Sequence, residues 1–253
     1  MPWLPDFTNA VELARLQTRA AGRPPRVVVS DPRSGEVRGH KRLREFVSRS
    51  QFLLTERHAR TETVASTVVG GRAVVERLVH LVGDKGEVAW PVAVVAESPD
   101  DRSVVFRNYF SQLPVFGRRD VRPPILEPRD SHFGGVVGRY HSARDAGDTD
   151  AIVSTFAANG YLREPIGPSC THRGTHELRS FFDACFSAGG GIGLQHCAVT
   201  DDGLSCVLEY NCVRWGSHDL APQAGLGVYE RGPDGLLAAA RVYDDVEAPV
   251  DKS

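Results

Sequence analysis

The sequence predicts an α+β protein that consists of two related units in tandem. Three features lead to this prediction: short motifs recur in the same order, a proline-rich stretch lies near the middle, and helical patterns precede runs of apolar strands. The chain has 253 residues, a length that suits either one large domain or two of about 120 residues each. The recurring motifs favour two units, each with helices packed on an antiparallel sheet.

The repeat is visible in several short matches between the two halves. A glycine followed by a short amphipathic helix occurs at Gly39–Phe46 and again at Gly174–Phe181. Hairpin turns are predicted at Glu97–Asp101 and Glu230–Gly235, because both place acidic residues and proline between apolar runs. Each turn leads into a strand that ends in Arg-x-Tyr, namely Arg107–Tyr109 and Arg241–Tyr243.

The stretch Arg118–Ser131 separates the two copies. It contains three prolines and several charged residues. Because proline has no N–H to donate to a ladder of hydrogen bonds, we predict an extended linker here. We place the boundary at residue 128, with a degenerate first unit at 1–128. The second unit, at 129–253, carries the candidate pocket.

The second unit begins with two predicted helices. The first spans Gly135–Ala146, and Asp148 is in position to cap the next, Thr149–Ala158. A short strand at Tyr161–Glu164 and a loop at Pro165–Pro168 follow. The remaining predicted elements are a helix at Thr175–Ala188, which three glycines end, and strands at Gly193–Thr200, Leu204–Trp215, Ala224–Glu230 and Leu236–Asp244.

The first unit has fewer of these elements. We expect an opening helix at Asn9–Ala21 and a short strand at Arg26–Ser30, without a second helix between them. The apolar strands Arg72–Val82, Val92–Ala96 and Val104–Leu113 suit a sheet that packs against another sheet.

Composition argues against several classes of function. The net charge is −2, so nucleic-acid binding is not expected. No apolar stretch approaches the length of a membrane span, and the N-terminus lacks the features of a signal peptide, so we expect a cytoplasmic protein. The five cysteines have no C-x-x-C spacing, and His172, His176 and His218 have no ligand spacing, so we predict neither disulfides nor a metal.

Three motifs of the second unit carry a family resemblance. In their order and spacing, Val136–Tyr140, Ala146–Val153 and Glu164–Gly167 resemble the ketosteroid isomerase and SnoaL-like polyketide cyclase families. The resemblance implies a nuclear transport factor two-like fold, in which a curved antiparallel sheet wraps on helices to form a cone. Subunits of this fold commonly pair through their sheets. Two tandem copies therefore imply an internal pseudo-dimer, to which a homodimer can be added.

The resemblance also implies roles for two side chains. Tyr140 corresponds to the tyrosine that stabilises an oxyanion, and Glu164 corresponds to the general base. A carboxylate removes a proton next to a carbonyl only if hydrogen bonds stabilise the developing oxyanion in a dry site. The protonated aspartate that is the second oxyanion donor of the isomerases has no counterpart in Gln223–Gly227. This difference argues against a steroid isomerase.

Further residues are expected in the same pocket. The resemblance places Val207, Glu209 and Asn211 toward the pocket on one central strand, because side chains alternate between the two faces. It places Asp244 there on the last strand, and His196 is expected to pair with Glu209. The predicted site therefore consists of catalytic Glu164, Tyr140, Glu209 and Asp244, with His196, Asn211, Val207, Trp215 and Phe156 against the substrate.

Structural roles stay open for the same residues. Tyr140 and His196 also suit an apolar core, and Glu164 suits a hydrogen bond within its own loop. A cross-strand pair with arginine is an equal alternative for Glu209. A cavity filled by Phe156, Phe181, Phe182 or Trp215 would argue against both enzyme hypotheses given below.

The first unit does not carry the motif. Its opening helix has Arg15–Gln17 where a tyrosine is expected. The dipeptide Asp31-Pro32 is either a relic of the base motif or, as we prefer, a turn. The internal repeat extends the resemblance to this copy, which we therefore expect to be a degenerate cystatin-like or SnoaL-like partner whose sheet supports the other unit.

The function that we expect is a cofactor-independent isomerase or cyclase of secondary metabolism. It would remove a proton next to the carbonyl of an apolar small molecule. One alternative is an epoxide hydrolase or epoxide-opening cyclase that uses Asp244 and Glu209 with Arg214 or Arg241. The other alternative is a non-catalytic module for small-molecule binding or assembly.

Overall fold

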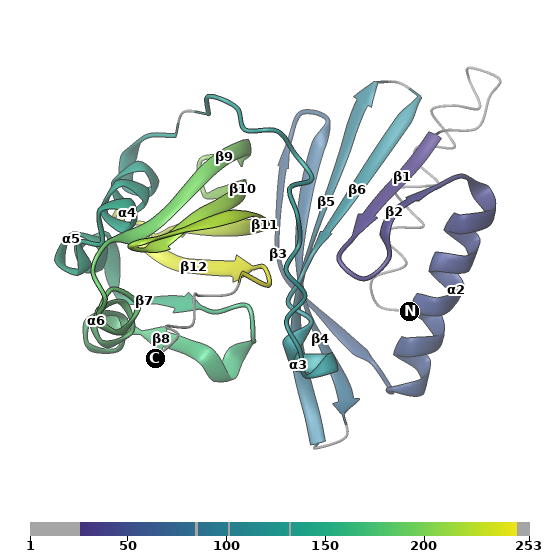
Figure 1. Cartoon of the computed structure of the whole chain (residues 1–253), viewed down its shortest axis with the longest axis horizontal. Helices are drawn as coiled ribbons and strands as arrows, with labels where there is room; N and C mark the ends of the chain where they lie inside the picture. The colour runs from purple at the N-terminus through teal and green to yellow at the C-terminus, as the bar shows by residue number, and fades with distance from the viewer. Residues whose placement is uncertain (1–25, 84–85, 101, 132, 247–253) are drawn as a thin grey trace. The chain divides into compact units, whose positions relative to one another are not determined.

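A computed structural model describes residues 26–83, 86–100, 102–131 and 133–246 of the chain. Its contacts divide into two units, which are described separately below (Figure 1). The first comprises residues 26–110 with Pro114–Gly117, and the second comprises Ser111–Leu113 with residues 118–246. Residues 118–128, predicted to belong to the first unit, thus group with the second. The predicted helix Asn9–Ala21 lies outside the described residues.

The first unit is a six-stranded sheet with one long helix along one face (Figure 1). The strand order is β2-β1-β6-β5-β4-β3, and β1 runs parallel to β6 while the other neighbours are antiparallel. Phe46 of the helix packs against Val29 and Phe106 of the sheet. The elements are β1 (Arg26–Asp31), β2 (Gly35–Arg38), α2 (His40–Glu56), β3 (Arg60–Val69), β4 (Arg72–Gly83), β5 (Gly86–Asp100) and β6 (Ser103–Tyr109), and the short helix α3 (Leu113–Phe116) follows.

The second unit repeats this arrangement. Its strand order is β8-β7-β12-β11-β10-β9, again with one parallel pair, β7 with β12. The helices α4 and α6 pack on one face of the sheet, over the largest apolar core cluster of the described residues. The elements are α4 (Gly135–Ala146), α5 (Thr149–Ser154), β7 (Phe156–Arg163), the 3-10 turn η1 (Pro168–Cys170), β8 (Thr171–Arg173), α6 (Gly174–Cys185), β9 (Gly191–Asp201), β10 (Ser205–Gly216), β11 (His218–Arg231) and β12 (Leu237–Tyr243).

The matching strand orders confirm the predicted α+β fold with two related units. The motifs that revealed the repeat also make the same contact in each copy. Arg107 donates to Glu97 at 2.6 Å in the first unit, and Arg241 donates to Glu230 at 2.8 Å in the second. Each sheet is mixed rather than wholly antiparallel as predicted, because the first strand of each unit lies parallel to the last. The predicted pairing of the two units stays a prediction.

One predicted helix is shorter than its pattern suggested. Asp148 caps α5 as expected, through a hydrogen bond from Ala151 N to its carboxylate at 2.9 Å. The helix ends at Ser154, four residues before the predicted end at Ala158. Leu237 N donates to Thr155 O at 2.8 Å, and Phe156 enters the core. Pairing with β12 therefore extends this segment as a strand, despite its helical pattern.

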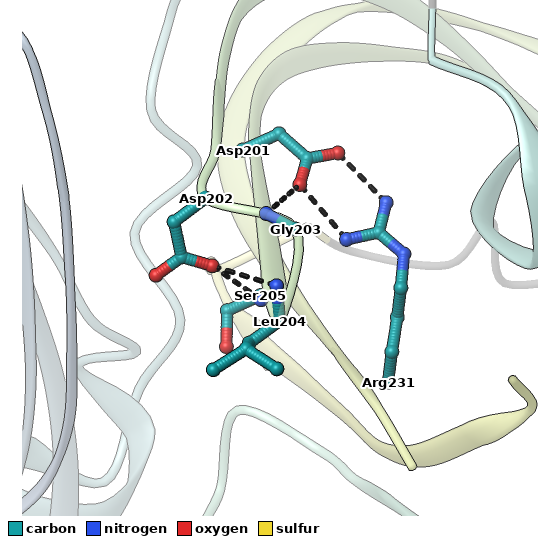
Figure 2. Close-up of polar contacts among 6 residues, drawn as sticks. All are labelled: Asp201, Asp202, Gly203, Leu204, Ser205 and Arg231. Carbon is teal, nitrogen blue, oxygen red and sulfur yellow. Dashed lines mark hydrogen bonds and ion pairs between the residues drawn. The ribbon is translucent and has the colours of Figure 1, made fainter. Parts of the chain in front are cut away.

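The turn between β9 and β10 is held by two aspartates (Figure 2). Arg231 of β11 donates two hydrogen bonds to Asp201, at 2.8 and 2.7 Å, and Gly203 N donates a third at 2.9 Å. The Asp202 carboxylate accepts from the backbone N–H groups of Leu204 and Ser205. Gly203 has a φ of +90°, a conformation that glycine adopts at little cost. This network fixes the register of three neighbouring strands.

The predicted linker is extended, and hydrogen bonds attach it to the sheet of the second unit. Ala224 N donates to Arg122 O at 2.8 Å, and the side-chain amide of Asn211 donates to Leu126 O at 3.2 Å. These bonds explain why residues 118–128 group with the second unit. Within the part of the chain that the structure describes, no helix has the length and apolar character to cross a membrane.

Candidate functional site

Tyr140 lies inside the packed core of the second unit. It stands on α4 and is 2% exposed, with its ring 5.4 Å from Tyr229 and 5.7 Å from Phe156. Phe182 belongs to the same cluster, and Trp215 packs against its edge. Burial raises the pKa of Tyr140, and the nearby Arg144 opposes this rise. Tyr140 and Phe156, which were to contact a substrate, thus contact one another in the core.

Glu164 directly follows β7, and the structure pairs it with a histidine. Its carboxylate lies 2.8 Å from the Nε2 atom of His172 on β8. The His172 ring stacks on Phe181, with ring centroids 4.3 Å apart. Both partners of this pair are about a quarter exposed, at 25% for His172 and 27% for Glu164. His172 was not predicted as a partner of Glu164. The pairing of the short strands β7 and β8, not a local spacing in the sequence, brings the two residues together.

The orientation predicted for β10 is wrong. Leu208 and Tyr210, with Cys206 and Cys212, belong to the core under the helices. Because side chains alternate along a strand, Val207, Glu209 and Asn211 face away from that core. All three are nonetheless buried, at 1–2% exposure. Both faces of this strand carry apolar and polar residues, so its pattern does not reveal which face meets the helices.

His196 is also placed differently from the prediction. Its ring lies 4.8 Å from Phe133 and 5.5 Å from His141, on the helix side of the sheet. Glu209 faces the opposite side, so the predicted pair of His196 with Glu209 does not form. Burial lowers the pKa of His196, which keeps the ring neutral at ordinary pH.

Asp244 directly follows β12 on the core side of the second unit. Tyr210 donates to its carboxylate at 2.5 Å, and Val246 N donates at 3.3 Å. Burial raises the pKa of Asp244, and it raises the pKa of Tyr210 well above the usual value. The hydrogen bond therefore joins a carboxyl group that loses its proton less readily than usual to a phenol that stays protonated.

The residues of the epoxide alternative do not all lie on one face of the sheet. Glu209 and Asp244 lie on opposite faces of the sheet, Arg214 donates to Asp145 at 2.6 Å, and Arg241 donates to Glu230. The structure therefore does not bring these four side chains together. Within the described ranges, no group of three or more His, Cys, Asp or Glu side chains is arranged to hold a metal.

Arg144 is a buried charged residue of this core that was not predicted from the sequence. It is 7% exposed, and it donates to His141 Nδ1 at 2.9 Å. Burial and Arg144 together hold the pKa of His141 well below its usual range. Among the described residues, Arg144 Nε and His141 Nε2 have no hydrogen-bond partner. The available signal was the spacing i, i+4 of Tyr140 and Arg144, which puts both on one helix face.

A cavity of about 180 Å³ lies in the first unit, between α2 and the sheet. Its walls are mainly apolar, and the strands β4 and β5 contribute Val79, Trp90, Val92 and Val94. Three polar side chains that are themselves buried also line it, with exposures of 5–7%: Asp31, Arg77 and Asn108. A mainly apolar cavity with a few fixed polar groups is typical of a small-molecule site.

Asp31 is the best-oriented of these polar groups. One carboxylate oxygen accepts from the backbone N–H groups of Arg33 and Ser34, both at 3.0 Å, and the other accepts from Asn108 Nδ2 at 3.0 Å. The predicted turn at Asp31 is therefore confirmed, and the same carboxylate also lines the cavity. Arg77 lines it from β4, and burial lowers the pKa of this guanidinium.

Asp31 occupies the same place in the first unit as Glu164 in the second. Ser30 pairs with Arg107 in the parallel pair β1–β6, and Arg163 pairs with Arg241 in β7–β12. The next residue is Asp31 in one unit and Glu164 in the other. The pocket was predicted in the second unit, whereas the cavity that this carboxylate lines lies in the first.

No protein-family model matches this chain. Several solved structures are similar to it, each over less than half of its length. A proposed polyketide cyclase from Sinorhizobium meliloti is 20% identical and covers 42% of this chain and 92% of its own, with a TM-score of 0.35. A SnoaL-like protein of unknown function from Burkholderia thailandensis is 20% identical, over 43% and 90%, with a TM-score of 0.36.

A third structure is the epoxide hydrolase/cyclase-like enzyme SalBIII, described for pyran ring formation in the polyether salinomycin. It is 22% identical and covers 43% of this chain and 87% of its own, with a TM-score of 0.37. Similarity at this level says nothing of activity. Over about the length of one unit, this chain is similar to SnoaL-like, NTF2-like and cystatin-like proteins.

Proposed function

We propose that the first unit binds a small, mainly apolar carbonyl compound and removes a proton from the carbon next to the carbonyl. Asp31 acts as the general base. The observation that carries this proposal is the Asp31 carboxylate on the cavity wall, oriented by two backbone N–H groups and the Asn108 amide. A base held in one geometry before the substrate arrives loses little entropy in the reaction.

Arg77 is the group suited to stabilise the oxyanion. The strand order places β6 and β5 between β1, which carries Asp31, and β4, which carries Arg77. Three strand spacings of about 4.8 Å separate their backbones by roughly 14 Å along the sheet. Both side chains line the same cavity, so a carbonyl group fits between a carboxylate at one end and a guanidinium at the other. A cation in a dry cavity stabilises developing negative charge strongly.

The size of the cavity limits the substrate to about one ring. An apolar cavity of about 150 Å³ in another protein binds benzene, and the cavity of this protein has about 180 Å³. Cyclohexanone is a suitable probe, because it has one ring, a carbonyl oxygen and exchangeable protons next to it.

The test is the exchange of these protons in D₂O, followed by NMR with the full chain. We expect Asp31→Asn to slow the exchange by about 10²-fold or more, which is the usual contribution of a general base. Asparagine makes the same type of turn as aspartate, so the variant should keep the local backbone. The matched control is Glu164→Gln, at the equivalent position of the second unit, which should leave the rate unchanged. If Glu164→Gln abolished exchange and Asp31→Asn did not, the site would lie in the second unit.

A further inference from the structure

The cavity of the first unit has two arginines in its lining that differ from Arg77 in being exposed. Arg33 follows the turn at Asp31, and Arg49 lies on α2. Both also line an adjoining surface groove, so they stand where the cavity meets the surface. From this arrangement, and resting on the proposed function, we propose that the substrate carries an anionic group, which Arg33 and Arg49 bind at the mouth of the cavity.

Arg33 is held in place without being neutralised. Its guanidinium lies 4.2 Å from the centre of the Phe116 ring, a cation–π contact that orients the side chain. In the described part of the chain, Arg33 forms no ion pair with a carboxylate. Because its own backbone N–H binds Asp31, its side chain starts from the end of the cavity where the base lies.

Arg49 is similarly available for a ligand. The carboxylate nearest to it is Glu45, at 3.9 Å, and the Arg49 side chain is 81% exposed. Such an exposed and distant pair contributes little binding energy. Arg49 also borders a second groove, whose lining has the basic residues Lys41 and Arg44 and one acidic residue, Glu45. A net charge of −2 for the whole chain makes this a local concentration of cations.

Arg33 and Arg49 therefore bring two positive charges to the mouth of the cavity. Among the described residues that line the cavity, Asp31 is the one carboxylate. Guanidinium groups bind carboxylates and phosphates in a bidentate geometry. A one-ring ketone with an acidic side arm would place its ring and carbonyl between Asp31 and Arg77, and its acid between Arg33 and Arg49. The substrate class that fits is a ring-bearing keto acid or a phosphorylated analogue.

The test compares two ligands that have nearly the same shape and differ in charge, 4-phenylbutanoate and 4-phenylbutanamide. Calorimetry at low salt should show that the acid binds about five- to tenfold more tightly, as two exposed charge-assisted contacts provide. The variant Arg33→Gln/Arg49→Gln should bind the two equally. The control Arg42→Gln removes a charge from the same helix at a residue that lines none of these cavities, and should keep the preference.

Two further measurements separate this inference from the proposed function. Benzoate, without the arm, should show the same affinity for the wild-type chain and for Arg33→Gln/Arg49→Gln, because it does not reach the mouth. Asp31→Asn, which lacks the base, should retain the preference for the acid. If Asp31→Asn lost exchange while the acid and the amide bound equally to the wild-type chain, the proposal of an anionic group on the substrate would be overturned. The proposed role of Asp31 as the base would be retained. Failure of all three ligands to bind would overturn both.

Discussion

The two units share a strand order and a carboxylate at the same position, yet one encloses a cavity and the other an aromatic core. The difference lies in a few side chains of the central strands. Tyr210 pairs with Gly225 in the second unit, where a Cβ atom on the glycine would lie 2.5 Å from the tyrosine ring. At the same register the first unit has Arg77 opposite Val92. The glycine therefore makes room for a ring that the first unit lacks.

A second pair of positions shows the same kind of difference between the two units. Tyr229 packs over Gly227 in the second unit, since a Cβ on this glycine would overlap the tyrosine hydroxyl. Counting from the Arg-x-Tyr motif through the strand pairing, Tyr229 corresponds to Ala96 of the first unit, and Gly227 corresponds to Val94. Two tyrosines are thus replaced by arginine and alanine. Differences at a few positions of a common scaffold thus accompany a cavity in one copy and an aromatic core in the other.

The largest test of this comparison removes one of the tyrosines. Tyr229→Ala should lower the free energy of unfolding by about 3–5 kcal/mol, the usual cost of deleting a buried aromatic ring. Val92→Ala, in the wall of the first cavity, should cost about 1–2 kcal/mol, because that wall already faces open space. Urea unfolding measures both. Equal costs would show that the second core is as loosely filled as the first.

A smaller effect concerns the buried acid of the second unit. Because burial raises the pKa of Asp244 above its value in the unfolded chain, the folded state holds this proton more tightly. Its contribution to stability is complete below the unfolded pKa of about 3.9. The contribution is then lost as the pH rises through the folded pKa.

Asp244→Asn keeps a hydrogen-bond acceptor for Tyr210 and removes the titration. We therefore expect its urea midpoint to fall less steeply with rising pH than that of the wild-type chain. The difference in stability between the two proteins should therefore change with pH, in favour of Asp244→Asn as the pH rises. Parallel pH profiles for the two proteins would mean that Asp244 titrates alike in the folded and unfolded chain.

The sequence was sufficient for those parts of the fold that local patterns control. The helix Gly135–Ala146 has the predicted ends, because a glycine flanks it on each side. The face of β10 could not be predicted, because Val207 and Leu208 are equally apolar and only the contacts with the helices distinguish them. The cavity also could not be predicted from local sequence patterns. Its volume depends on which side chains four neighbouring strands and a helix bring together, and Asp31 has the same sequence signature as an ordinary turn.

The smallest expected change in stability comes from filling the cavity, and it tests the comparison from the opposite direction. Val92→Phe places a ring in the first unit at the position where Gly225 makes room for Tyr210 in the second. A cavity of about 180 Å³ has space for this ring, so unfolding should change by less than about 1 kcal/mol, in contrast to overpacking of a full core. Cyclohexanone exchange should nevertheless disappear. If the variant folded as well as the wild-type chain and still catalysed exchange, the substrate would not occupy this cavity, and Asp31 would be no more than the turn that its sequence predicts.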